Sequence, residues 1–87
     1  MKIVAKPIDA LVVFKGTEKP IPCRFKYKEA DETIREVRIG KILVTEEQRI
    51  AGQRTFLYEC QSEIDGVMKR YQLKYLVQEA RWVLYKI

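Results

Sequence analysis

The segment FLYECQSEIDGVMKRYQLKY, residues 56–75, contains an Asp-Gly pair between two runs of alternating apolar and polar residues. This arrangement is the strongest short-range signal for a β-hairpin with a two-residue turn. A turn at Asp65-Gly66 pairs Ile64 with Val67 and thereby sets the register of the whole hairpin. One face then holds the pairs Cys60–Tyr71, Tyr58–Leu73 and Phe56–Tyr75, and the other holds Leu57–Lys74, Glu59–Gln72, Gln61–Arg70 and Glu63–Met68. The first face is apolar, so we expect it to form the core.

The rest of the chain also has strand patterns. Residues 8–14 alternate with apolar residues on both faces, and residues 21–28 place Ile21, Cys23, Phe25 and Tyr27 on one face. Residues 33–44 change parity across Gly40, which is typical of a β-bulge in one long, bent strand that keeps Ile42 and Val44 on a common face. Residues 81–87 are apolar on both faces, which suits a strand that closes the sheet on an earlier one.

Residues 45–52 are ambiguous. Thr45 and Gln48 fit a helical capping box, and Gly52 suits the residue after a helix. The flanking segments are β-like, so we favour a strand and a turn at Ala51-Gly52, with one short helix near 45–51 as the alternative. The sequence therefore predicts an all-β domain over 1–87, a small antiparallel barrel of five or six strands with SH3-like or Sm-like proportions.

The chain has 87 residues and a net charge of +5. This length suits one domain with one modest core. The longest apolar run, residues 10–14, is far shorter than the roughly 20 residues of a membrane helix. The first ten residues show no apolar secretion signal. We therefore expect a bacterial, cytoplasmic protein without a membrane partner.

The available side chains restrict the chemistry. The chain has no histidine, and its two cysteines, Cys23 and Cys60, lack metal-site spacing, so we expect two free core thiols, no metal and no cofactor. Ser62, the only serine, is expected opposite Lys69, and serine-lysine dyads occur in some hydrolases. The pair is expected near the solvated hairpin tip, and Glu59 and Glu63 have no acid–base partner opposite them. We therefore expect no enzymatic activity.

The basic residues offer one alternative. Arg24, Lys26 and Lys28 line one strand face, and Arg70 and Lys74 line another. Small barrels bind nucleic acid by combining such a face with exposed aromatic rings. Most aromatic residues here fall on faces assigned to the core, and only Tyr85 is expected to join Lys74 outside. A lysine-rich strand usually serves edge protection and solubility.

Several short motifs resemble a family of short uncharacterised proteins of Gram-positive, clostridium-like bacteria. The motifs are KPID (6–9), PIPCRF (20–25), AG (51–52), YECQSEIDG (58–66), YQLKY (71–75) and RWVLYKI (81–87). The resemblance implies a cytoplasmic domain whose function is not known. The family pattern has glutamate where this chain has Gln72, and no site residue is carried over.

These observations favour a non-enzymatic interaction module that binds a protein partner or itself. The alternative is nucleic-acid binding through Arg24, Lys26, Lys28, Arg70 and Lys74, and an enzyme is a remote third.

Overall fold

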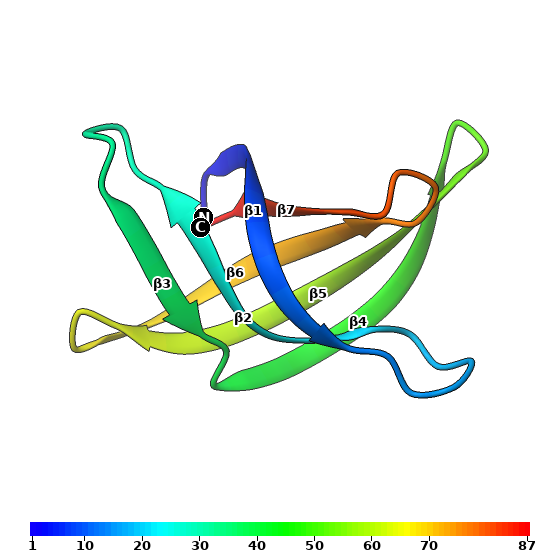
Figure 1. Ribbon diagram of the computed structural model, residues 1–87, viewed down its shortest axis with the longest axis horizontal. Helices are drawn as coiled ribbons and strands as arrows, with labels where there is room; N and C mark the ends of the chain where they lie inside the picture. The colour runs from blue at the N-terminus through cyan, green and yellow to red at the C-terminus, as the bar shows by residue number, and fades with distance from the viewer.

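The computed structural model describes residues 1–87 and contains seven β-strands and no helix. The strands are β1 (Ile3–Val13), β2 (Ile21–Lys28), β3 (Ile34–Arg38), β4 (Lys41–Ile50), β5 (Gln53–Ile64), β6 (Val67–Leu76) and β7 (Arg81–Lys86). They form one antiparallel sheet in the order β3-β2-β1-β7-β6-β5-β4, which curls into a half-barrel (Figure 1). The expected all-β, antiparallel class is confirmed.

Two details of the expected barrel are wrong. The structure has seven strands rather than five or six, and the terminal strands β3 and β4 do not pair with each other, so the barrel is not closed. The count differs because the expected long strand over 33–44 is divided at Ile39-Gly40 into β3 and β4. The strand favoured over 45–52 is confirmed, since β4 continues to Ile50 and turns at Ala51-Gly52.

The sheet curls because β1 belongs to both of its walls. The N-terminal half of β1 pairs with β7, and the half from Asp9 onward pairs with β2. The chain bends where Ala5 adopts a φ of 46°, next to a register shift in the β1–β7 ladder. Such irregularities increase the local twist of a strand. One wall therefore consists of β1, β2 and β3, and the other of β1, β7, β6, β5 and β4.

The second corner lies at Ile39-Gly40. The Ile39 N–H donates to the Cys23 carbonyl of β2 at 3.0 Å, and the Gly40 N–H donates to the Gln61 carbonyl of β5 at 3.1 Å. A Cβ atom on Gly40 would lie 3.0 Å from that Gln61 oxygen. Glycine is therefore needed for the close approach that carries the chain from one wall to the other, which explains the parity change in the sequence.

The hairpin register expected from Asp65-Gly66 is confirmed from Ile64–Val67 to Phe56–Tyr75. Asp65 and Gly66 have φ values of 53° and 75°, as a two-residue hairpin turn with two positive φ angles requires. The expected apolar face is largely the core. Phe56, Tyr58, Cys60, Ile64, Tyr71 and Leu73 are buried with Phe25, Tyr27, Val37, Trp82 and Leu84, and Tyr75 packs partly buried against them.

Three expectations about individual faces are wrong. The β1–β2 ladder shifts register between Leu11 and Val12, which pair with Arg24 and Pro22, so Cys23 is an extra residue between them. Cys23 is consequently exposed rather than in the core. The second face of β1 is open, since Leu11 is 61% exposed. A shift after Ile42 also turns Val44 outward, away from the face it was expected to share with Ile42.

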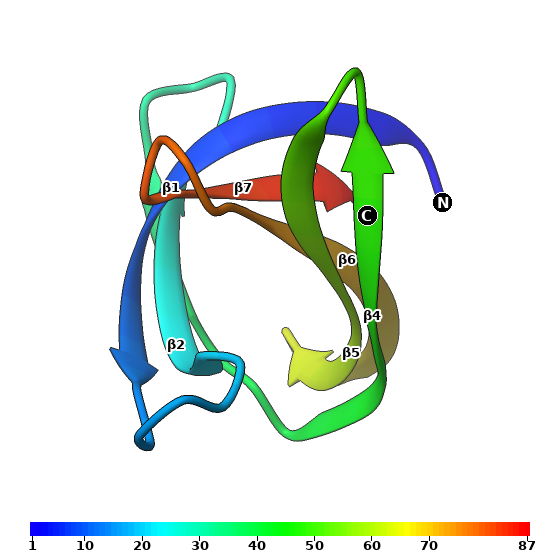
Figure 2. The same cartoon turned by 90° about the vertical axis from the view of Figure 1, so that its right-hand side faces the viewer.

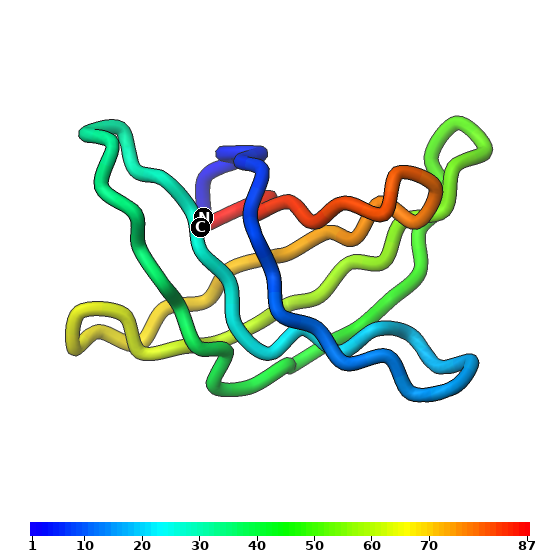
Figure 3. The backbone as a smooth tube through the Cα atoms, viewed as in Figure 1, coloured from blue at the N-terminus to red at the C-terminus, as the bar shows by residue number.

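One side of the half-barrel is held together by Arg35 of β3. Its Nη1 lies 2.5 Å from the Asp65 carboxylate at the β5–β6 turn, and its Nε lies 2.7 Å from Glu29. The two chain ends also lie side by side (Figure 3). There the backbones of Lys2 and Ile87 exchange two hydrogen bonds, of 2.8 and 3.0 Å. The other side of the half-barrel, between β4 and the β1–β2 loop, remains open. No helix capable of crossing a membrane is present.

Candidate binding cleft

A cleft of about 810 Å³ occupies the open side of the half-barrel. It lies between β4 and the loop that joins β1 to β2, residues 14–20, and Figure 2 looks onto this side of the molecule. Its lining comes from the loop, from the start of β2 and from the concave faces of β4, β5 and β6. This volume is in the range of small-molecule and cofactor sites.

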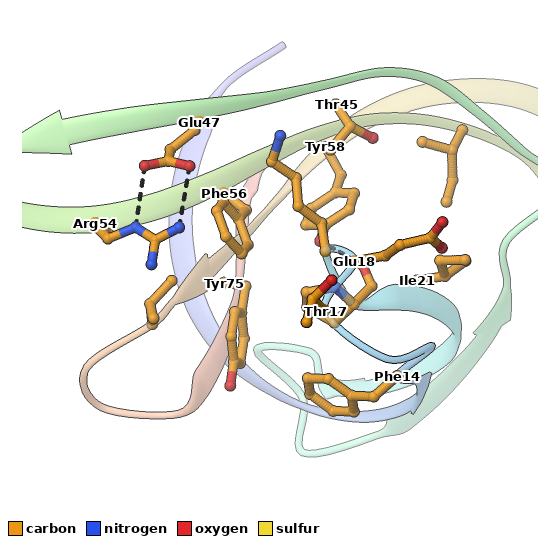
Figure 4. Close-up of a pocket in the computed structure, with 14 residues that line it drawn as sticks. Phe14, Thr17, Glu18, Ile21, Thr45, Glu47, Arg54, Phe56, Tyr58 and Tyr75 are labelled. Carbon is orange, nitrogen blue, oxygen red and sulfur yellow. Dashed lines mark hydrogen bonds and ion pairs between the residues drawn. The ribbon is translucent and has the colours of Figure 1, made fainter.

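The floor of the cleft is aromatic. Phe56 and Tyr58 project from β5 and Tyr75 projects from β6, all on the concave face (Figure 4). The Tyr58 hydroxyl donates a hydrogen bond to the Pro20 carbonyl, which fixes the loop against the sheet. Phe14, 62% exposed, forms the opposite wall, with its ring edge-on to Tyr75 at a centroid distance of 6.4 Å. Phe56 and Tyr58 are themselves buried, so the apolar surface that the cleft presents comes mainly from Phe14 and the partly buried Tyr75.

Strand β4 borders the cleft with an unpaired edge. It is the terminal strand of the sheet and pairs only with β5. The side chains of Thr45 and Glu47 point into the cleft (Figure 4), and Val44 and Ile50 on the same strand are exposed. An unpaired edge offers a row of peptide N–H and C=O groups to another extended segment.

The polar groups of the cleft are concentrated around Phe56. Arg54 donates two hydrogen bonds to the Glu47 carboxylate, at 3.0 and 3.2 Å. These bonds, together with the charges of Arg54, Lys19 and Arg49, hold the pKa of Glu47 below its ordinary value. The Lys19 Nζ and the Arg54 guanidinium both lie over the Phe56 ring, at 5.6 and 5.4 Å from its centroid. Cations at such distances are attracted by the ring face.

The structure does not bring the five basic residues of the nucleic-acid alternative to one surface. Arg24, Lys26 and Lys28 lie on β2, whereas Arg70 and Lys74 lie on β6, and β1 and β7 separate these strands. The buried faces of β2 and β6 meet in the core, where the rings of Phe25 and Tyr71 lie 5.5 Å apart. Their outer faces therefore point away from each other.

Several of these cations also have local partners. Arg24 forms an ion pair with Glu36 at 3.3 Å, and Lys28 pairs with Glu32 at 3.2 Å. The Lys74 Nζ lies 3.6 Å from the centroid of the Tyr85 ring, which is the pair expected outside the core. These contacts are typical of strand surfaces in solvent.

Ser62 lies inside the protein rather than near solvent. It is 1% exposed, and its Oγ shares a hydrogen bond of 2.6 Å with the Tyr71 hydroxyl and accepts the Gly40 N–H at 3.1 Å. Lys69, its partner across the hairpin, is exposed. The hydroxyl therefore belongs to the corner at Gly40, out of reach of a substrate. No three potential metal-ligating side chains cluster in the protein.

The cleft residues were missed by sequence reasoning. Phe14 follows the alternation of residues 8–14 and was expected on a strand face, but β1 ends at Val13 and the ring lies at the cleft. Lys19 belongs to a segment that reads only as a turn. No local pattern shows that this turn folds across to β5, because that depends on the buried Tyr58–Pro20 hydrogen bond, which joins residues 38 positions apart.

Comparisons with models of protein families, with curated proteins and with solved structures find no significant match to this chain.

Proposed function

We propose that this protein is a non-enzymatic interaction module that binds an extended segment of a partner protein in the cleft beside β4. The observation that carries the proposal is the combination of an unpaired strand edge with an ordered aromatic floor at the same opening. Each feature alone is common in small β-proteins. Together they match the recognition mode in which a peptide adds a strand to a sheet and places alternate side chains in a pocket.

The backbone of β4 supplies the first part of the interaction. A partner strand hydrogen-bonded to β4 would lie about 4.8 Å from it, over the mouth of the cleft. The free edge from Val44 to Ile50 is about 20 Å long, which suits a segment of roughly seven residues. Main-chain hydrogen bonds of this kind give affinity with little dependence on sequence.

The aromatic floor supplies the second part. Side chains of a bound strand alternate, so every second residue of the partner would face the cleft, where Phe14 and Tyr75 are accessible. Phe14 is the most exposed of these rings, and covering it removes apolar surface from water. Aromatic anchors in ordered pockets often dominate the energy of an interface.

The charged groups of the cleft support binding rather than catalysis. Glu47 is tied to Arg54 through two hydrogen bonds, and its lowered pKa leaves it ionised at neutral pH. A general acid or base works best with a pKa near the operating pH. The remaining polar side chains of the cleft do not form a nucleophile–base pair.

A selection from a random peptide library tests the proposal. The immobilised protein should enrich peptides with β-branched or aromatic residues at alternate positions, as strand addition requires. The Phe14→Ala variant should retain these peptides several-fold less, because it loses one wall of the cleft. Leu11→Ala is the matched control, since Leu11 is as exposed as Phe14 but lies on the outer face of β1.

Three results would refute the proposal, the first two of them from the binding experiments. One is a failure to enrich any peptide, together with salt-sensitive binding of labelled single-stranded DNA or RNA, which would favour the nucleic-acid alternative. The other is equal retention by the wild type and Phe14→Ala. Light scattering that shows a dimer dissociated by Phe14→Ala but not by Leu11→Ala would also refute it, by making a second copy of the chain the occupant.

A further inference from the structure

We infer that the segment bound in the cleft is acidic, and that its carboxylates are received by Lys19, Arg49 and Arg54. The inference rests on the proposed function, because it specifies the chemistry of the partner in the same cleft. It follows from an imbalance of charge at the end of the cleft where β4 turns into β5. We call these three residues the cation cluster.

The cation cluster contains two arginines that face each other. Arg49 of β4 lies directly opposite Arg54 of β5 in the hairpin register, two pairs along from Glu47 and Phe56. Residues two positions apart on a strand share a face, so Arg49 projects to the cleft side with Glu47. Like charges directly opposite each other destabilise a hairpin. An anionic ligand beside them would relieve this repulsion.

The only carboxylate at this end of the cleft is already occupied. Glu47 forms a bidentate ion pair with Arg54, whereas Lys19 and Arg49 form no ion pair in the protein. Glu18 also lines the cleft, but it lies toward Ile21, away from the Glu47–Arg54 pair (Figure 4). Lys19, over the Phe56 ring, and Arg49, two pairs along β4, thus have no ion-pair partner of their own.

Strand addition brings a partner side chain to this point. The residue opposite Arg49 on an added strand would have its Cβ about 4.5–5.5 Å from that of Arg49. An aspartate or glutamate there reaches the guanidinium directly. Residues two and four positions further along the partner would face the aromatic floor. The expected ligand is therefore a segment with a carboxylate followed, at even spacing, by apolar or aromatic residues.

Three fluorescein-labelled peptide mixtures of about nine residues test the inference, a length that covers the free edge of β4. All three have the same β-branched and aromatic residues at alternate positions. The residue two positions before the first of these, which shares their face of the strand, is Asp or Glu in the first mixture, Ser or Gln in the second, and Lys or Arg in the third, and the positions between carry Ser and Gln in all three. Binding is followed by fluorescence anisotropy at low and high salt.

We expect the acidic mixture to bind about three- to tenfold more tightly than the neutral one, and the basic mixture to bind most weakly. The preference for acid should shrink in high salt, because exposed charges are screened. The Arg49→Gln and Lys19→Gln variants should each reduce the ratio of acidic to neutral affinity at least about twofold. Arg70→Gln, which removes an exposed arginine from β6, should retain the full preference.

The outcomes separate the inference from the proposed function. Equal binding of the acidic and neutral mixtures would overturn the inference and leave the peptide-binding function standing. An acid preference that Arg70→Gln reduces as much as Arg49→Gln would also overturn it, because the preference would then reflect only the net charge of +5. If no mixture binds and the library selection also fails, the proposed function fails first.

Discussion

The buried pair Ser62–Tyr71 provides a quantitative test of the corner at Ile39-Gly40. The Tyr71 hydroxyl is completely buried, and Ser62 Oγ, at 2.6 Å, is its hydrogen-bond partner. Burial raises the pKa of Tyr71, so it stays protonated and can donate. In Ser62→Ala the hydroxyl of Tyr71 loses this partner, which costs about 1–3 kcal/mol for a buried polar group. Tyr71→Phe leaves Ser62 its Gly40 contact and should cost about 0.5–1.5 kcal/mol.

The double variant distinguishes this pair from two independent contacts. Replacing both partners by apolar groups of similar shape can be nearly neutral, so the double variant should cost less than the sum of the single ones. A coupling free energy of about 0.5–3 kcal/mol is typical for residues in one hydrogen-bonded network. Each kcal/mol should change the melting temperature of a domain this size by about 4–8 °C.

The assay is urea denaturation of the four proteins at pH 7, with thermal melts as a second measure. Gly40→Ala provides a further comparison, because its new Cβ would meet the Gln61 carbonyl at 3.0 Å and destabilise the same corner by a steric route. Additive single effects, each below about 0.5 kcal/mol, would show that the buried hydrogen bond does not hold the corner, and would refute this reasoning.

Three further predictions concern the core and the thiols. Phe56→Ala should lower the free energy of unfolding by roughly 3–5 kcal/mol, measured in urea, and a loss below about 1 kcal/mol would mean that the faces of the β5–β6 hairpin are assigned backwards. In native protein Ellman's reagent should modify Cys23 quickly and Cys60 only after unfolding, so fast reaction of two thiols would contradict the burial of Cys60. Burial raises the pKa of the Cys60 thiol to about 12 from an ordinary value of 9.0. The unfolded chain therefore loses this proton first, and the free energy of unfolding should fall as the pH rises from about 9 to 12. Cys60→Ala should make this fall less steep. The same dependence on pH in the variant and the wild type would contradict the role of Cys60.

Sequence reasoning recovered the elements whose register is set locally. The Asp65-Gly66 turn fixed both faces of the β5–β6 hairpin because strand side chains alternate strictly from the turn outward. The strand over 45–50 and the bend at Gly40 were recovered for similar local reasons. Strict alternation gave the wrong face at two bulges. The extra residue Cys23 in β2 placed its own side chain in solvent, and the shift after Ile42 in β4 turned Val44 outward.

The cleft could not be predicted in this way. It depends on Phe14 and Lys19 reaching β5 and β6 across the open side of the barrel, which no local pattern encodes. The basic residues were correctly placed on the faces of two strands, but the nucleic-acid alternative required those two faces to form one surface. A sheet that bends through β1 instead carries Arg24 and Arg70 on opposite walls.

The central claim is that a partner segment pairs with the free edge of β4, and amide hydrogen exchange measures this most directly. Exchange would be followed by NMR for the free protein and for its complex with a peptide from the library selection. The account predicts that alternate amides between Val44 and Ile50, open to solvent in the free protein, become protected in the complex. The amides of β3, the other terminal strand, should keep their exchange rates. Protection confined to β3, or a complex in which the β4 amides exchange as fast as before, would contradict strand addition at the cleft.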